Sequence, residues 1–155
     1  MDTSTAPTPL ATTTLKNGAL AWDAAIEGAG GGFVSNSKDL VIWGKALFEG
    51  NAMKGDYLGE LLHSVPISSD IPGVEYGIAV GIHRNGPHGL RYGHGGWIPG
   101  YVSSLRYYPR YRIAIAFQIN TDVGIVDDST PLVEELEEQL SRLIIDSQAT
   151  RSLKE

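Results

Sequence analysis

The strongest fold signal lies in residues 90–120, LRYGHGGWIPGYVSSLRYYPRYRIAIAFQIN. Glycine and proline divide this stretch into segments of strand length, and the Pro109-Arg110 turn predicts a hairpin. An Asn-Gly-Pro turn at 85–87 predicts a second hairpin just upstream. We therefore predict four antiparallel strands. They are Glu75–Arg84, Leu90–His94, Tyr101–Tyr108 and Tyr111–Asn120.

The last of these strands has two chemically different faces. Large apolar side chains alternate with alanines, and consecutive side chains of a strand point to opposite faces. One face carries Ile113, Ile115, Phe117 and Ile119, and the other carries Ala114 and Ala116. The pattern predicts a well-covered strand with its small residues beneath a close-packed helix.

Helices are predicted on both sides of the strand region. Ser37–Glu49 has apolar residues at helical spacing after the N-cap Asn36, and Lys54–His63 is a shorter candidate. A final helix is predicted from the N-cap Thr130 and Pro131, with its apolar face on the sheet. That face carries Leu132, Leu136, Leu140, Leu143 and Ile144. Helices followed by strands predict an α+β fold, in a single domain over 1–155 with an irregular arm at 1–15.

The amino-acid composition argues against some classes of function for this chain. A net charge of -6 argues against nucleic acid as a partner, and the absence of cysteine excludes disulfides and thiolate chemistry. The first fifteen residues contain no continuous apolar run, so we expect neither a signal peptide nor a membrane span.

The sharpest chemical signal is the run His94-Gly95-Gly96-Trp97. It places an imidazole at the end of a predicted strand, and the glycines after it let a substrate approach the backbone. The main-chain N–H of Trp97 is then a candidate donor to a developing oxyanion. A glycine-rich turn with a surface histidine explains the same residues without chemistry, and the motif alone leaves both interpretations open.

The order of motifs along the chain distinguishes between these interpretations. Six short motifs follow one another: Gly30-Gly31-Gly32-Phe33-Val34-Ser35 with Asp39-Leu40, Tyr76-Gly77, Tyr92-Gly93-His94-Gly95-Gly96, Pro99-Gly100-Tyr101, Tyr108-Pro109 and a strand that ends at Asn120. From about Gly28 onward the chain resembles the C-terminal half of the class C β-lactamase and D-alanyl-D-alanine carboxypeptidase superfamily.

This resemblance implies a serine hydrolase fold in which an antiparallel sheet lies between helices. His94 is similar to the basic residue of the family's third active-site motif, Gly95 and Gly96 to its next two members, and Trp97 to the oxyanion-hole donor. Gly95 replaces the Thr or Ser that helps bind a β-lactam carboxylate, which favours peptidase or esterase activity in the intact protein. The family implies small-molecule or peptide substrates, no cofactor, and a periplasmic or secreted location.

The nucleophile of the family is missing. Ser35-Asn36-Ser37-Lys38 has the form Ser-x-x-Lys, but it coincides with a helix-capping segment and Lys38 is expected to face solvent. Tyr101-Val102-Ser103 imitates the second motif but lies in a strand, where ordinary sheet pairing explains it. Without an activated serine, acyl transfer has no attacking group, and we expect the isolated chain to be inactive.

The remaining polar and aromatic residues receive structural interpretations. His63, His83 and His88 lack metal-ligand spacing and are expected at the surface, so no metal site is predicted. Trp22 and Trp43 are expected to pack in the core or on a helix face. The run from Glu134 to Glu138 is expected to be a solvated helix face.

Three hypotheses follow for the whole chain. The first is the C-terminal portion of a β-lactamase-like hydrolase, whose exposed sheet edge drives homo-oligomer formation. The second is a non-catalytic module that binds D-alanyl peptides or β-lactams near His94. The third is a stable fragment without a function of its own.

Overall fold

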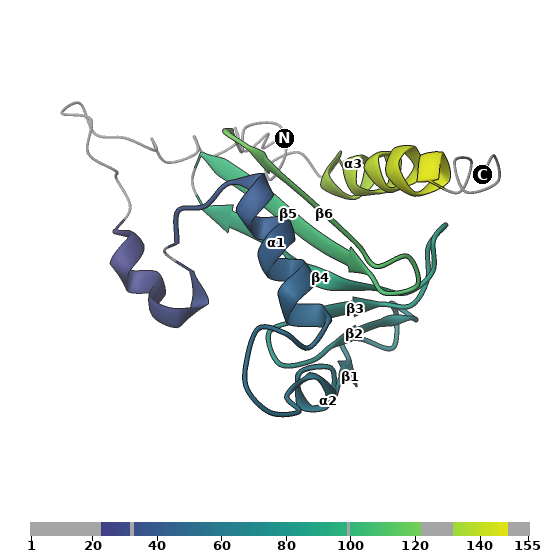
Figure 1. Ribbon diagram of the computed structural model, residues 1–155. Coiled ribbons are helices and arrows are strands. Elements are labelled where there is room, and N and C mark those ends of the chain that lie inside the picture. The colour runs from purple at the N-terminus through teal and green to yellow at the C-terminus, as the bar shows by residue number, and fades with distance from the viewer. Residues whose placement is uncertain (1–22, 32, 99, 122–131, 149–155) are drawn as a thin grey trace, which may run out of the picture.

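A six-stranded antiparallel sheet forms the centre of the computed structural model, which describes residues 23–31, 33–98, 100–121 and 132–148. The strand order follows the chain order (Figure 1). The strands are β1 (Val65–Pro66), β2 (Val74–Tyr76), β3 (Gly81–His83), β4 (Arg91–Ile98), β5 (Tyr101–Tyr108) and β6 (Ile113–Ile119). The helical elements are η1 (Ala24–Gly30), α1 (Ser37–Phe48), α2 (Leu58–Leu61), α3 (Leu132–Ser141) and η2 (Arg142–Asp146). The predicted α+β class is confirmed.

Helix α1 begins where the sequence predicts. The Asn36 side chain accepts a hydrogen bond from the main-chain N–H of Asp39 at 3.0 Å and donates one to the Asp39 carboxylate at 2.7 Å. This cap satisfies a main-chain donor that the first helical turn leaves free. The helix crosses β5 and β6 (Figure 1). It lies so close that a Cβ at Gly44 would be 2.8 Å from the Leu105 side chain.

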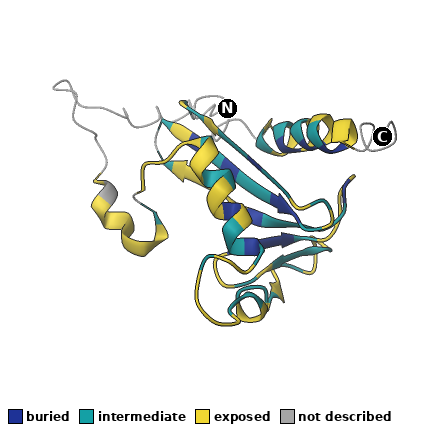
Figure 2. Cartoon of the chain, viewed as in Figure 1, coloured by how far each residue is buried: buried dark blue, intermediate teal, exposed yellow. Residues whose placement is uncertain are grey.

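Two hydrophobic clusters occupy the two faces of the sheet. Phe48 of α1 packs with Val80, Ile82 and Tyr107, and Ala114 contacts this cluster. The C-terminal helical segment buries Ile145 against Tyr108 and Ile115. Tyr107 and Tyr108 are consecutive on β5 and pack in different clusters, on opposite faces. Buried segments lie along the strands and on the helices that cover them (Figure 2). The predicted division of β6 into a small face beneath a helix and a large face is therefore confirmed.

The predicted strand Glu75–Arg84 is interrupted. The chain leaves β2 at Gly77, whose N–H donates to Val80 O at 2.8 Å, and a Cβ at Gly77 would lie 2.4 Å from Leu61 O. Ala79 has a positive φ of 55°, which no regular strand accommodates. A tight turn against the end of α2 thus makes two short strands of one predicted strand.

The predicted helix Lys54–His63 is shorter than expected. It forms only over Leu58–Leu61, because Gly55 adopts a left-handed φ of 82° and the Tyr57 hydroxyl holds the preceding loop by donating to Leu47 O at 2.9 Å. The segment after it forms β1, a short strand that is not among those predicted from the sequence. Pro66 is tolerated there because β1 is an edge strand. The sheet therefore has six strands instead of four.

The C-terminal helix packs on the sheet through a shifted set of residues. The predicted cap at Thr130 and Pro131 lies outside the described residues, as does the predicted arm at 1–15. A wider π-turn at Arg142–Asp146 follows α3 and changes the helical phase, so that Ile145 is buried while Leu143 is 70% exposed. The assignment of Leu143 to the packed face is wrong for this reason.

The tryptophan predictions have separate outcomes. Trp22 lies outside the part of the chain that the structure describes. Trp43 is 50% exposed on α1 instead of packed in the core. Among the described helices, each is too short or too polar to serve as a membrane span.

Candidate active-site wall on strand β4

Strand β4 extends four residues beyond its predicted end at His94. The extra residues pair with β5, with Gly96 opposite Ser103 and Trp97 opposite Val102. The glycines after His94 therefore lie within a strand rather than in a loop beyond it. Pro99, the next motif residue, is outside the described ranges.

Gly93 adopts a backbone conformation that points its Cβ position at β5. It has a φ of 153°, and a Cβ there would lie 1.9 Å from the carbonyl oxygen of Leu105. Only glycine fits this position, because any side chain would force β4 away from β5. Packing against β5 therefore requires glycine at position 93, directly before the candidate histidine.

His94 lies exposed at the centre of the strand, opposite Leu105. Its Nε2 atom is 2.7 Å from the hydroxyl of Tyr76, and the two rings meet edge to face at 5.7 Å between centroids. Its Nδ1 atom contacts the carbonyl oxygen of Gly95. Both ring nitrogens are therefore engaged by groups of β2 and β4.

Tyr76 is a site residue that sequence reasoning missed. The Tyr76-Gly77 pair drew attention only as one piece of the motif order, because a tyrosine eighteen residues from the histidine gives no spacing signal. The antiparallel arrangement of β2, β3 and β4 brings it within hydrogen-bond distance of His94.

Gly95, Gly96 and Trp97 complete the exposed run. A Cβ at Gly96 would lie 2.5 Å from the Ser103 hydroxyl, which fills the space that a side chain would need. The Trp97 side chain is 53% exposed. The structure therefore brings His94, Gly95, Gly96 and Trp97 together on one accessible strand, as their adjacency requires, and adds Tyr76 and Ser103 as neighbours.

The Ser-x-x-Lys imitation lies apart from this strand. Ser35 and Lys38 are both exposed at the start of α1, and the Ser35 hydroxyl interacts only weakly with Asn36 O at 3.4 Å. Gln118 of β6 donates to Ser35 O at 3.3 Å. The expectation that Lys38 faces solvent is confirmed. Ser103 pairs within the sheet, as expected for a strand residue.

A second polar region lies beneath α3, and it contradicts two predictions. Glu137 is 5% exposed, accepts a hydrogen bond from Ser104 and pairs with Arg106 at 2.9 Å. The interpretation of the whole glutamate run as a solvated face is therefore wrong at its centre. Helical spacing points Glu137 inward, where Arg106 and Ser104 of β5 supply its partners.

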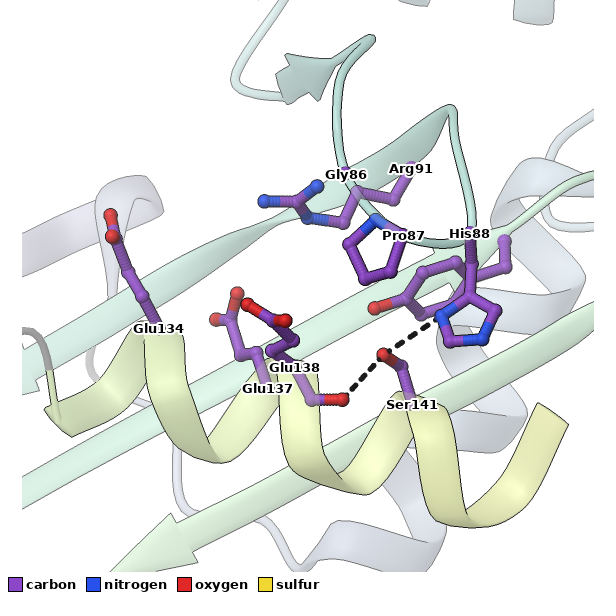
Figure 3. Close-up of a pocket in the computed structure, with 9 residues that line it drawn as sticks. Gly86, Pro87, His88, Arg91, Glu134, Glu137, Glu138 and Ser141 are labelled. Atoms are coloured by element: carbon purple, nitrogen blue, oxygen red, sulfur yellow. Dashed lines mark hydrogen bonds between the residues drawn. The ribbon is translucent and has the colours of Figure 1, made fainter. Parts of the chain in front are cut away.

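His88 is buried instead of lying at the surface. Its Nδ1 lies 3.2 Å from the Ser141 hydroxyl, which donates onward to Glu138 O (Figure 3). Its Nε2 lies 3.0 Å from the Asp146 carboxylate. The hairpin between β3 and β4 is tied to the C-terminal helix by these contacts.

His83 is half-buried between two arginines. Burial, together with the charges of Arg106 and Arg91, lowers the pKa of His83 to about 4. Desolvation and like charge both disfavour the imidazolium. The expectation of a surface position is correct only for His63, which is exposed.

A small cavity of about 120 Å³ lies between this hairpin and α3 (Figure 3). Its lining includes His88, Arg91, Tyr108 and the glutamates 134, 137 and 138. None of the residues His94–Trp97 lines it. Within the described ranges, no group of three or more histidines and carboxylates is arranged to hold a metal ion.

Comparison with solved structures shows similarity to a protein of named activity. It is a D-stereospecific amidohydrolase from Streptomyces sp., at 30% sequence identity and a TM-score of 0.60. The alignment covers 68% of this chain, and the chain spans only 30% of the amidohydrolase. Protein-family models give no match to the sequence, and curated proteins give no significant match.

The amidohydrolase is a serine hydrolase with a penicillin-binding-protein/β-lactamase fold. The six-stranded sheet with its helices matches part of that fold. The similarity does not single out the class C enzymes. The chain thus has part of a β-lactamase-like serine hydrolase fold, and its similarity to the amidohydrolase supports a place in the penicillin-binding-protein/β-lactamase superfamily.

Proposed function

We propose that this chain is the C-terminal portion of a β-lactamase-family serine hydrolase and supplies one wall of its substrate cleft. The observation that carries the proposal is the exposed run His94–Trp97 on β4, in a fold similar to that of a D-stereospecific amidohydrolase. An imidazole on a rigid strand is a precise place for a proton-transfer group.

Each residue of the run has a role in this proposal. His94 is the proton-transfer group of the run. Gly95 and Gly96 leave the backbone open to the substrate, and the Trp97 N–H donates to the oxyanion. Gly95 has no hydroxyl for a β-lactam carboxylate, which favours amides or esters of D-amino acids over β-lactams, although β-lactam hydrolysis remains within the class.

The proposal places the nucleophile outside this chain. A serine acts in acyl transfer only when a base or a neighbouring lysine activates it. Ser35 is exposed beside a helix cap and Lys38 faces solvent, so the two side chains do not form a buried site that could activate the serine. The isolated chain is therefore inactive in this proposal.

The test measures turnover by the purified chain. D-amino-acid amide, ester and β-lactam reporters are incubated with the wild type and with Ser35→Ala, and no turnover above background is expected for either. Turnover by the wild type that Ser35→Ala abolishes would overturn the assignment of the nucleophile to another segment.

The alternative is a non-catalytic module that binds D-alanyl peptides or β-lactams. The exposed His94 and Tyr76 pair favours it, because hydrogen-bonding groups on a strand can hold a ligand without chemistry. Calorimetric titration with an acylated D-alanyl-D-alanine peptide separates the two. Saturable binding that His94→Ala removes and His63→Ala retains supports the module, and absence of binding contradicts it.

We also propose that the chain forms a homo-oligomer through the outer edge of β6. In the described part of the chain β6 pairs only with β5, which leaves one edge of seven residues open to another strand. Ile42 and Trp43 on α1 add exposed apolar surface. Light scattering at micromolar concentration should give the mass of a dimer or larger assembly, and a monomer mass would contradict the proposal.

A further inference from the structure

The Tyr76 and His94 contact carries an inference that rests on the proposed function and makes it more specific. Two different partners engage the ring of His94. Nδ1 faces the carbonyl oxygen of Gly95, and Nε2 lies 2.7 Å from the hydroxyl of Tyr76. The two partners have different hydrogen-bonding capacities, and that difference fixes the proton on the ring.

The carbonyl oxygen of Gly95 can only accept a hydrogen bond. A hydrogen bond between it and Nδ1 therefore requires the proton on Nδ1. In the neutral imidazole the other nitrogen, Nε2, is then an acceptor. The hydroxyl of Tyr76 can donate, so it satisfies the lone pair of Nε2.

We propose that Tyr76 is a positioning residue, which holds neutral His94 as the tautomer protonated on Nδ1 and leaves Nε2 as the basic nitrogen of the candidate site. The phenol ring meets the imidazole edge to face and limits rotation of His94 about its side chain.

The backbone on both sides of Tyr76 is held in place, although its side chain is 40% exposed. Tyr76 is the last residue of β2, and the chain turns away at Gly77, which is pressed against Leu61 O. Tyr76 pairs with Gly81, and Gly81 pairs with Gly93, the residue before His94. The register therefore places Tyr76 two strands away from Gly93, and the Tyr76 hydroxyl reaches His94 Nε2 from there.

The test reads the tautomer directly and needs no substrate. Histidine labelled with ¹⁵N in the full chain gives separate nitrogen signals for each ring in two-dimensional spectra, recorded at a pH where His94 is neutral. His94→Gln assigns the His94 signals. The expected wild-type spectrum shows a protonated Nδ1 and an unprotonated Nε2 as the majority form.

Tyr76→Phe removes the donor and keeps the ring. The form protonated on Nδ1 should fall from the majority to the minority, because Nε2–H is the tautomer that an unconstrained imidazole favours. Tyr101→Phe, on an exposed tyrosine of β5, should leave the His94 signals unchanged. A wild-type spectrum with the proton on Nε2, or equal spectra for wild type and Tyr76→Phe, would overturn the proposal.

The wild-type spectrum decides the tautomer even if the Tyr76→Phe variant loses its fold. The outcome of the tautomer measurement is also independent of the outcome of the turnover and binding tests of the proposed function. A failure to find hydrolysis or binding leaves the tautomer result intact, and a wrong tautomer leaves the hydrolase proposal standing with a different positioning group.

Discussion

Two histidines of neighbouring segments, His88 and His94, have opposite environments. His88 is buried, contacts Ser141 and Asp146, and has its ring edge to face with Tyr108 and Tyr111. His94 is exposed and contacts Tyr76 of β2, two strands away in the sheet. The first histidine connects a hairpin to the C-terminal helix, and the second is accessible from solvent.

Two consecutive serines of β5 repeat the contrast. Ser104 is 2% exposed and donates to Glu137 beneath α3. Ser103 lies opposite Gly96, next to the candidate wall. The polar groups beneath α3 satisfy one another, whereas those around His94 border on solvent. We infer that the first region maintains the fold and that the second is free to serve function.

The largest expected effect on the free energy of unfolding comes from removing one partner of the buried ion pair beneath α3. Glu137→Ala removes the buried carboxylate that pairs with Arg106 and accepts from Ser104. The Arg106 side chain is only 12% exposed, so its charge would remain largely buried without its partner. Breaking such a pair costs about 3–5 kcal/mol, which urea denaturation should detect as a lower free energy of unfolding.

Glu135→Ala is the matched control on the same helix. Glu135 is exposed and accepts only from Gln139, one turn away. Its replacement should change the free energy of unfolding by no more than about 0.5 kcal/mol. Equal losses for both variants would show that burial of Glu137 contributes nothing to stability.

A smaller effect is expected from the pH dependence of stability. Burial, followed by the charges of Arg106 and Arg91, lowers the pKa of His83 to about 4 from its usual 6.5. Between these values the unfolded chain binds a proton that the folded chain does not. Stability is therefore lost as pH falls from about 6.5 to about 4.

His83→Gln tests this dependence, because glutamine does not titrate. Urea denaturation of both proteins at several pH values gives the difference between them, in which the other histidines cancel. The variant should lose less stability than the wild type over this window. A parallel pH dependence of the two proteins would contradict the assigned cause.

The sequence predicts the elements that depend on local pattern. Asn36 predicts the start of α1 because capping is a local interaction, and the alternation over Ile113 to Ile119 identifies both faces of β6. The turn at Gly77 is different. It depends on the carbonyl of Leu61 lying against it, a contact between separate elements that no short window contains.

The candidate site also contains residues that a local motif reveals and residues that only the tertiary structure brings together. His94 to Trp97 is a continuous motif and could be found by inspection of the sequence. Tyr76 reaches His94 only because β2, β3 and β4 lie side by side, and Glu137 is buried only because Arg106 and Ser104 lie beneath α3. Partners of this kind follow from tertiary structure and have no signature in residue spacing.

The smallest expected effect on stability is that of His94→Ala. Because the variant should keep its fold, a loss of ligand binding can be assigned to the missing imidazole. The His94 side chain is exposed, and exposed contacts contribute little net free energy. Urea denaturation should show a change of no more than about 0.5 kcal/mol, although the variant abolishes ligand binding in the module hypothesis. A loss as large as that of Glu137→Ala would make His94 a structural residue, and the distinction between the two regions would then fail.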